Sequence, residues 1–345
     1  MKSHMKILFL SIAIGIFSGY TVFSQDCAVK LQEAQAQFDR GQVELVAGSL
    51  MPCLEAGNFS REDELAAYKL LIHSLLLDER IEQAEEIMLG FLKRNPEYEH
   101  TAADYTGFIY LKNQFQAKPV MMLSVKAGLN YSILSVTSSN SLSPLEPDVS
   151  YAREPFNIYA GTEIILPVAE RLNIAAGLFF SSSSFLYTEN MMNFGTVSYR
   201  ESQSRLEVPV TAIYDIKKMG RVTLYGRLGG GLALNLNTDS KPAFNPTDIN
   251  NVINRTGENV NRTTSRIRSD LFLQAGLGGY LKVPHGFLSA EIRTVLGTRN
   301  QLIYSNPDNL EYFYFYSDDN FRVNIAGISL GYTHIFYKPS KKQDL

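Results

Sequence analysis

Within residues 119–338, the side chains that could do chemistry are four carboxylates and four cations. The carboxylates could act as paired general acids and bases, but the equal number of basic side chains makes salt bridges the better interpretation. We therefore expect a structural charge network with no catalytic, cofactor-binding or metal-binding set. Its members are Lys126, Glu163, Arg205, Glu207, Arg227, Asp270, Glu291 and Arg293.

Nucleophilic catalysis is the other chemistry to consider. A serine nucleophile needs a positioned histidine with an acid beside it. Of the five histidines, only His334 falls within a predicted strand. A partnership of His334 with a serine of a neighbouring strand stays open, but no such grouping is evident, and we expect that the protein is not an enzyme.

The elements that must position these charges are strands. After a linker at 116–119 the apolar period changes from about 3.6 residues to 2, which is typical of strands with two unlike faces. Val222, Leu224 and Leu228 share one face of a predicted strand, and Arg227 lies on the other. Eight strands are predicted, at about 121–136, 155–166, 172–187, 197–216, 222–237, 265–283, 287–298 and 320–337.

This alternation, apolar outside and polar inside, is typical of a transmembrane β-barrel. The connections support this interpretation, because short turns at 167–171, 217–220 and 284–286 alternate with long polar segments. The interior of an eight-stranded barrel is just filled by side chains, so the charge network is expected to pair internally and close the lumen. The pattern shifts near Ala326 and Gly327, which predicts a bulge in the last strand.

The first residues have the features of a secretory signal. Lys2 and Lys6 precede the apolar run 7–17, and a cleavage site is predicted before Gln25. Removal of residues 1–24 leaves 30 basic and 35 acidic side chains, so nucleic acid is not an expected partner. Cys27 and Cys53 form an even pair in an exported chain, which favours a disulfide over two free thiols.

Between the signal and the strands, apolar residues recur at the helical spacing of three and four. One unit resembles a tetratricopeptide repeat, a looser unit precedes it, and residues 100–115 are expected to form a capping helix with Ala102 and Ile109 on its apolar face. Such repeats can bind a peptide in a concave groove, or they can simply pack. The repeat positions are Tyr68, Leu71, Leu75, Ala84, Met88, Phe91 and Pro96.

The strand region also resembles a known family. Residues 204–210, Ser-Arg-Leu-Glu-Val-Pro-Val, and the glycine-rich stretch 226–231 are similar to the PorT-like outer-membrane barrels that are common in Bacteroidetes. The resemblance covers residues 119–338 and implies the barrel fold. Some relatives belong to a protein-secretion and gliding machinery, and others have no assigned role.

Together these features predict an α+β multidomain protein, in which an all-α helical-hairpin domain precedes an eight-stranded antiparallel transmembrane barrel. The expected parts are a signal peptide (1–24), a periplasmic helical domain (25–117), an outer-membrane barrel (118–338) and a periplasmic tail (339–345). The leading hypothesis is a non-enzymatic anchor in outer-membrane lipid for a helical domain that binds a periplasmic protein or peptide. A small-solute channel with a helical plug and a lipid-modifying enzyme are the alternatives. The sequence leaves the oligomeric state open.

Overall fold

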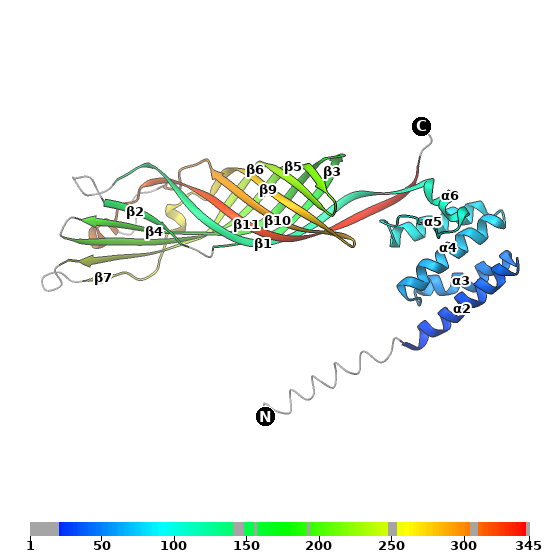
Figure 1. Ribbon diagram of the computed structural model, residues 1–345. Coiled ribbons are helices and arrows are strands. Elements are labelled where there is room, and N and C mark those ends of the chain that lie inside the picture. The colour runs from blue at the N-terminus through cyan, green and yellow to red at the C-terminus, as the bar shows by residue number, and fades with distance from the viewer. Residues whose placement is uncertain are drawn as a thin grey trace, which may run out of the picture. The chain divides into compact units, whose positions relative to one another are not determined.

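The computed structural model describes residues 21–140, 148–154, 157–191, 194–247, 254–303 and 310–342 (Figure 1). The chain divides into two compact units. One extends to Lys118 and also includes the chain from Tyr337 onward, and the other is Pro119–Phe336. The first 20 residues of the predicted signal peptide lie outside the described residues.

The first unit is built from helical hairpins. Gly41 and Gly57 have positive φ angles of 79° and 67°, so they reverse the chain after the first two helices at little steric cost. The Ser60 side chain accepts a hydrogen bond from the Asp63 amide and so caps the third helix. The helices are α2 (Thr21–Asp39), α3 (Val43–Ala56), α4 (Arg61–Leu77), α5 (Ile81–Arg94) and α6 (Thr106–Asn113).

The core of this unit lies around α4, which contacts α2, α3, α5 and α6. Cys27 of α2 and Cys53 of α3 are joined in a disulfide, with their Cα atoms 5.7 Å apart. The predicted repeat positions are all buried except Pro96, which lies half-buried after α5. The buried positions are Tyr68, Leu71, Leu75, Ala84, Met88 and Phe91.

The last helix differs from its prediction. Helix α6 begins at Thr106 rather than near residue 100, and it buries Phe108 and Leu111. Ala102 is exposed and lies before the helix. The segment before α6 is instead ordered by Asp104, whose carboxylate accepts hydrogen bonds from the Thr101 amide (2.8 Å) and the Tyr98 hydroxyl (2.7 Å). This capping turn takes the place of the extra helical turn that we expected.

Asp104 also forms an ion pair with Lys69 of α4, with 2.7 Å between Nζ and Oδ1. Only 3% of the Asp104 side chain is exposed. Burial alone would raise the pKa of Asp104, but the hydrogen bonds from Lys69, Thr101 and Tyr98 outweigh it and hold the pKa below the ordinary value of 3.8. The contact therefore favours the folded state most when Asp104 is ionised.

The end of the chain belongs to the helical unit as well. The Tyr337 hydroxyl donates a 2.6 Å hydrogen bond to Glu97, and the Lys342 amide donates to the Gln114 carbonyl oxygen at 2.7 Å. Lys341 forms an ion pair with Glu85 of α5. Part of the predicted tail at 339–345 is therefore strand that is fixed to the helices, and residues 343–345 lie outside the described residues.

The second unit is a closed antiparallel sheet (Figure 1). Its ring follows the order β1-β3-β4-β5-β6-β9-β10-β11, and β11 pairs with β1. The strands are β1 (Phe115–Ser138), β2 (Asp148–Arg153), β3 (Asn157–Ala169), β4 (Leu172–Met191), β5 (Gly195–Met219), β6 (Val222–Pro246), β7 (Arg255–Thr256), β8 (Val260–Asn261), β9 (Ser269–Val283), β10 (Gly286–Gly297) and β11 (Asn320–Lys341).

The described sheet has eleven strands, three more than predicted. The extra strands are β2, which pairs with β4, and β7 and β8, which pair with β6. They arise because β4, β5 and β6 continue far toward the end of the barrel that is opposite the short turns, so that segments predicted as loops find strand partners. Residues 188–191 and 195–196, which lie between the predicted strands 172–187 and 197–216, accordingly belong to β4 and β5.

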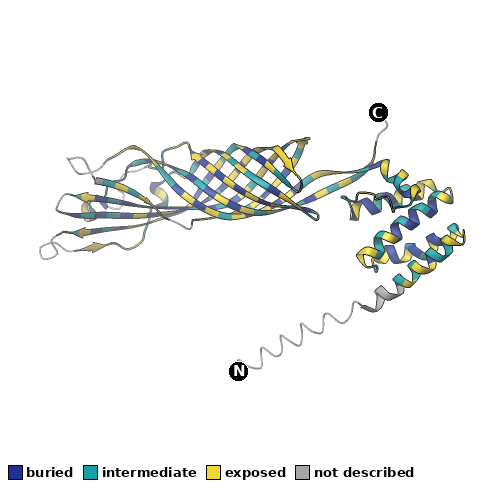
Figure 2. Ribbon diagram, in the orientation of Figure 1, coloured by how far each residue is buried: buried dark blue, intermediate teal, exposed yellow. Residues whose placement is uncertain are grey.

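Burial alternates along the ring strands (Figure 2). On β5 the outward residues between Leu206 and Ile216 are apolar, and those from Ser204 toward Gly195 are polar. This change marks the edge of an apolar band, as expected of a barrel in lipid. The bulge predicted at Ala326 is absent from the β10–β11 pairing. A register shift occurs instead opposite Leu236, between Ser204 and Arg205 of β5.

No helix in the described part of the chain combines the length and apolarity needed to cross a membrane.

Replacing Cys53 by Ser should destabilise the helical unit. The disulfide closes a loop with a sequence separation of 26 residues, and its removal is expected to lower the free energy of unfolding of this unit by about 3 kcal/mol. Hydrogen exchange of α2 and α3 in the full-length protein measures the effect. Equal protection in the variant and the parent would contradict the prediction, and β9 provides an internal control because it lies in the other unit.

Asp104→Asn should cost about 1.5–3 kcal/mol at neutral pH, the usual range for a hydrogen bond to a charged group. A carboxyl with a depressed folded pKa stabilises above its unfolded pKa and loses that contribution as the pH falls through its folded pKa. The difference between variant and parent should therefore shrink below pH 3.8. Unfolding of the helical unit at neutral and acidic pH checks this, and a difference that is independent of pH would refute it.

Candidate functional site

Four of the predicted charges meet inside the barrel as one network. Lys126 lies 3.0 Å from Glu163 and 2.9 Å from Glu291. Arg227 donates two hydrogen bonds to Glu163, at 2.6 and 2.8 Å, and its Nε lies 3.2 Å from Glu291. Each cation therefore contacts both carboxylates, and the Tyr225 hydroxyl donates a further bond to Glu291 at 2.7 Å. The four charges cancel, and their side chains are almost fully buried.

Next to this network is a layer formed by an ion pair and aromatic rings. Arg293 forms an ion pair of 3.1 Å with Glu207 and donates to the Asn130 side chain at 3.0 Å. The Arg293 guanidinium also lies over the Tyr159 ring, 3.4 Å from its centroid. Tyr159 in turn stacks on Phe179 with 4.6 Å between centroids. This layer fills the lumen with planar groups.

The two remaining predicted charges contact neutral partners. Arg205 donates to the Ser183 hydroxyl at 3.0 Å. Asp270 accepts hydrogen bonds from the Arg299 amide (3.0 Å) and the Gln301 side chain (3.1 Å). All eight predicted residues are buried on the inward face, but the structure joins only six of them in charged contacts with one another.

Glycines make the close packing of the interior possible. A Cβ atom on Gly229 would lie 2.3 Å from the Val210 carbonyl oxygen, and one on Gly231 would lie 2.4 Å from that of Val208. Gly161 is similarly close to the Leu178 carbonyl oxygen, at 2.2 Å. Gly229 and Gly231 on β6 therefore have a packing role, because larger residues would push neighbouring strands apart.

A second charged cluster, which was not predicted, lies toward the end of the barrel that is opposite the short turns. Arg266 contacts Glu201 and Asp318, each at 2.6 Å, and Arg262 also pairs with Asp318. Tyr316 stacks on Tyr199 beside this cluster, with 3.8 Å between ring centroids. The Tyr199 hydroxyl donates to Glu201 at 2.6 Å.

Two members of this cluster were recognisable from the sequence. Arg266 falls within the predicted strand 265–283 and has the same strand parity as Asp270. Glu201 has the same strand parity as Arg205 and Glu207, which places it on the inward face of β5. Arg262 and Asp318 lay in segments predicted as loops, which carry no periodic signal. Only the folding of these segments back over the barrel interior brings them together.

The structure gives no support to nucleophilic chemistry at His334. Its ring lies against that of Phe336, with 4.8 Å between centroids, and its Cα partner on β10 is Gly286. None of the hydrogen bonds within the described residues joins His334 to a serine. Those residues also contain no group of three or more His, Cys, Asp and Glu side chains that could hold a metal ion.

The arrangement of the charges indicates what the barrel interior can do. Cations and carboxylates from different strands that neutralise one another leave little net charge to attract an ion. Buried pairs of this kind also resist separation, because breaking one leaves a charge in a low-dielectric environment. The interior thus acts as a polar core that holds the ring together.

Comparison with known proteins places this geometry in context. Residues 114–300 match the family described as "Outer membrane protein beta-barrel domain". That match spans more than half of the chain. No protein with a curated description matches the sequence.

Solved structures of outer-membrane proteins are also similar. They include Neisserial surface protein A (12% identity, 63% of this chain and 97% of that one, TM-score 0.28) and OprG of Pseudomonas aeruginosa (8%, 63% and 97%, 0.29). A third is Ail of Yersinia pestis in complex with a heparin analogue (14%, 62% and 99%, 0.27).

Glu163→Gln tests the network. The substitution removes the carboxylate that Lys126 and Arg227 share, so the barrel should lose about 3–5 kcal/mol of stability. Urea unfolding in lipid vesicles measures the loss. Glu154→Gln is the matched control, because it removes one carboxylate from a partly exposed pair with Arg200 and should cost at most about 1 kcal/mol. Equal losses in both variants would show that the buried network has no special role.

Proposed function

Because the chain belongs to the family of outer-membrane protein β-barrel domains, we propose that its barrel is an anchor in the bacterial outer membrane for a helical domain that binds a protein or peptide in the periplasm. The protein would serve as a component or adaptor of an export or envelope assembly. Within this proposal, the helical domain is like a tetratricopeptide-repeat domain, and the barrel is of the PorT-like type found in Bacteroidetes.

The observation that carries the proposal is the filled lumen. The buried charge network links four strands across the interior. Its members are Lys126 of β1, Glu163 of β3, Arg227 of β6 and Glu291 of β10. A solute path would require these buried ion pairs to separate, at a cost of several kcal/mol each. These contacts favour the anchor over the channel with a helical plug, and we look for the function in the parts outside the ring.

The proposed orientation follows from register. Met122, near the start of the ring part of β1, pairs with Ile165, close to the short β3–β4 turn. At the other end of the chain, His334 of β11 pairs with Gly286 in the short β9–β10 turn region. The chain therefore enters and leaves the barrel at the end where the short turns lie. In outer-membrane barrels the short turns are periplasmic, so the helical domain would lie in the periplasm.

The helical domain has apolar side chains available for a partner. Leu77 and Ile81 are 55% and 56% exposed at the two sides of the α4–α5 turn. Helix α3 packs against α4, and its residue Leu45 is 48% exposed. Exposed apolar side chains of this kind are common on protein-binding surfaces. We propose that they contact an apolar segment of the partner.

A non-enzymatic role is part of the same proposal. It is supported by the contacts of His334 described above and by the structural use of the inward carboxylates in ion pairs. A lipid-modifying activity would need a nucleophile and a base near a lipid-facing opening.

The test is affinity purification of the full-length protein from native membranes, followed by mass spectrometry. A version lacking residues 27–115 should lose the partner. Leu77→Ser combined with Ile81→Ser should weaken capture, and Val29→Ser is the matched control because Val29 is equally exposed on α2, at 52%.

Conductance in planar bilayers completes the test. The parent protein should show none above background. If the full-length protein and the deletion come down with the same proteins, or if the parent conducts, the anchor hypothesis is wrong.

A further inference from the structure

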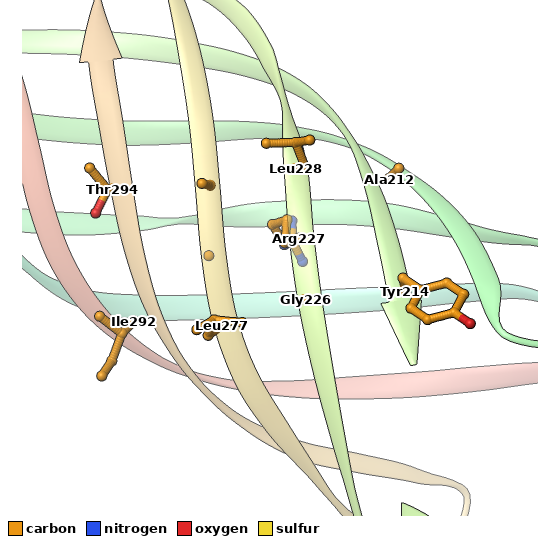
Figure 3. Close-up of a pocket in the computed structure, with 10 residues that line it drawn as sticks. Ala212, Tyr214, Gly226, Arg227, Leu228, Leu277, Ile292 and Thr294 are labelled. Atoms are coloured by element: carbon orange, nitrogen blue, oxygen red, sulfur yellow. The ribbon is translucent and has the colours of Figure 1, made fainter. Parts of the chain in front are cut away.

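The outward face of the barrel has a hollow of about 550 Å³ (Figure 3). It spans four neighbouring strands, β5, β6, β9 and β10. Its floor is made of small residues, Ala212, Gly226 and Ala275, whereas larger apolar residues surround it. These are Leu228, Leu277 and Ile292, which are 69%, 66% and 66% exposed.

The glycine in the floor is not required by packing. A Cβ on Gly226 would find its nearest atoms at 3.5 Å (Ile216) and 3.8 Å (Leu277), which are ordinary contact distances. The inward glycines described above have no such room. The empty space at Gly226 is therefore a feature of the lipid-facing surface, and an apolar chain of the bilayer is the natural group to fill it.

Polar groups lie beside the hollow on its short-turn side. Tyr214 borders it and pairs with Gly226 across the β5–β6 hairpin. The next pair toward the turn is Lys217 with Leu224. Leu224 lies on the exposed outward face, so Lys217 is on that face as well. Asp215 pairs with the buried Tyr225, which places this carboxylate on the inward face.

Along this surface, in the direction of the short turn, the apolar hollow is therefore followed by the Tyr214 phenol and then by the Lys217 ammonium group. We propose that the site binds an anionic glycerophospholipid of the leaflet that meets the short turns. One acyl chain occupies the hollow, the Tyr214 hydroxyl hydrogen-bonds the glycerol ester region, and Lys217 pairs with the phosphate. Basic side chains at a membrane surface attract anionic lipids in this way. The inference rests on the outer-membrane placement of the barrel but not on a partner of the helical domain.

Native mass spectrometry of the full-length protein tests the site, with dioleoyl-phosphatidylglycerol or dioleoyl-phosphatidylcholine added to the detergent. The parent should retain one phosphatidylglycerol in preference to phosphatidylcholine. Lys217→Gln should weaken retention about fivefold, the equivalent of roughly 1 kcal/mol for one lysine near anionic lipid. Gly226→Leu should abolish retention, because a Cβ at this position meets only side-chain atoms at ordinary contact distance and the rest of the leucine is expected to occupy the hollow.

Two matched controls should stay within about twofold of the parent. Lys218→Gln removes a lysine of the same turn whose Cα partner, Thr223, lies on the inward face. Ala160→Leu enlarges an exposed residue on β3, away from the hollow. Equal retention of both lipids, unchanged retention in Gly226→Leu, or a dimer that Gly226→Leu dissociates would overturn the proposal. None of these outcomes depends on whether a protein partner is captured.

Discussion

A sheet that crosses a bilayer has to pair its backbone N–H and C=O groups within itself, because hydrocarbon offers no hydrogen-bond partner. In this protein the ring meets that requirement by pairing β4 with β5 and β11 with β1, so that no ring strand has a free edge over the apolar band. Closure then fixes two further properties. The outward residues must be compatible with lipid, and the inward residues must fill a space that is only a few side chains wide.

The narrow interior explains why charges and glycines occur together there. Long cationic side chains such as Arg227 and Arg293 reach across the lumen, and they are tolerated because a carboxylate meets each of them. Glycines such as Gly229 allow adjacent backbones to accommodate these side chains. A second cluster around Arg266 repeats the same solution where the strands continue past the apolar band. Ion pairs therefore occupy the interior in two separate regions, one inside the apolar band and one beyond it.

The helical unit is stabilised by contacts between parts of the chain that are remote in sequence. The disulfide of Cys27 and Cys53 joins its first two helices, and Tyr337 and Lys341 return from the last strand to contact α5 and the segment that follows it. A helical domain that includes the final strand residues can be completed only after the whole chain has been made.

The sequence by itself determined the barrel class, because strand periodicity and the inward parity of residues such as Lys126 and Glu291 depend only on local spacing. It also indicated the helical hairpins, since the apolar positions from Tyr68 to Phe91 follow helical geometry. The tertiary structure decided which charges pair, and it alone joined Arg262 to Asp318, because these residues lie in aperiodic segments 56 residues apart. It also decided that the predicted loops around β2, β7 and β8 are partly strand and that the last strand residues belong to the helical unit. Such contacts depend on long-range pairing, which local periodicity does not encode.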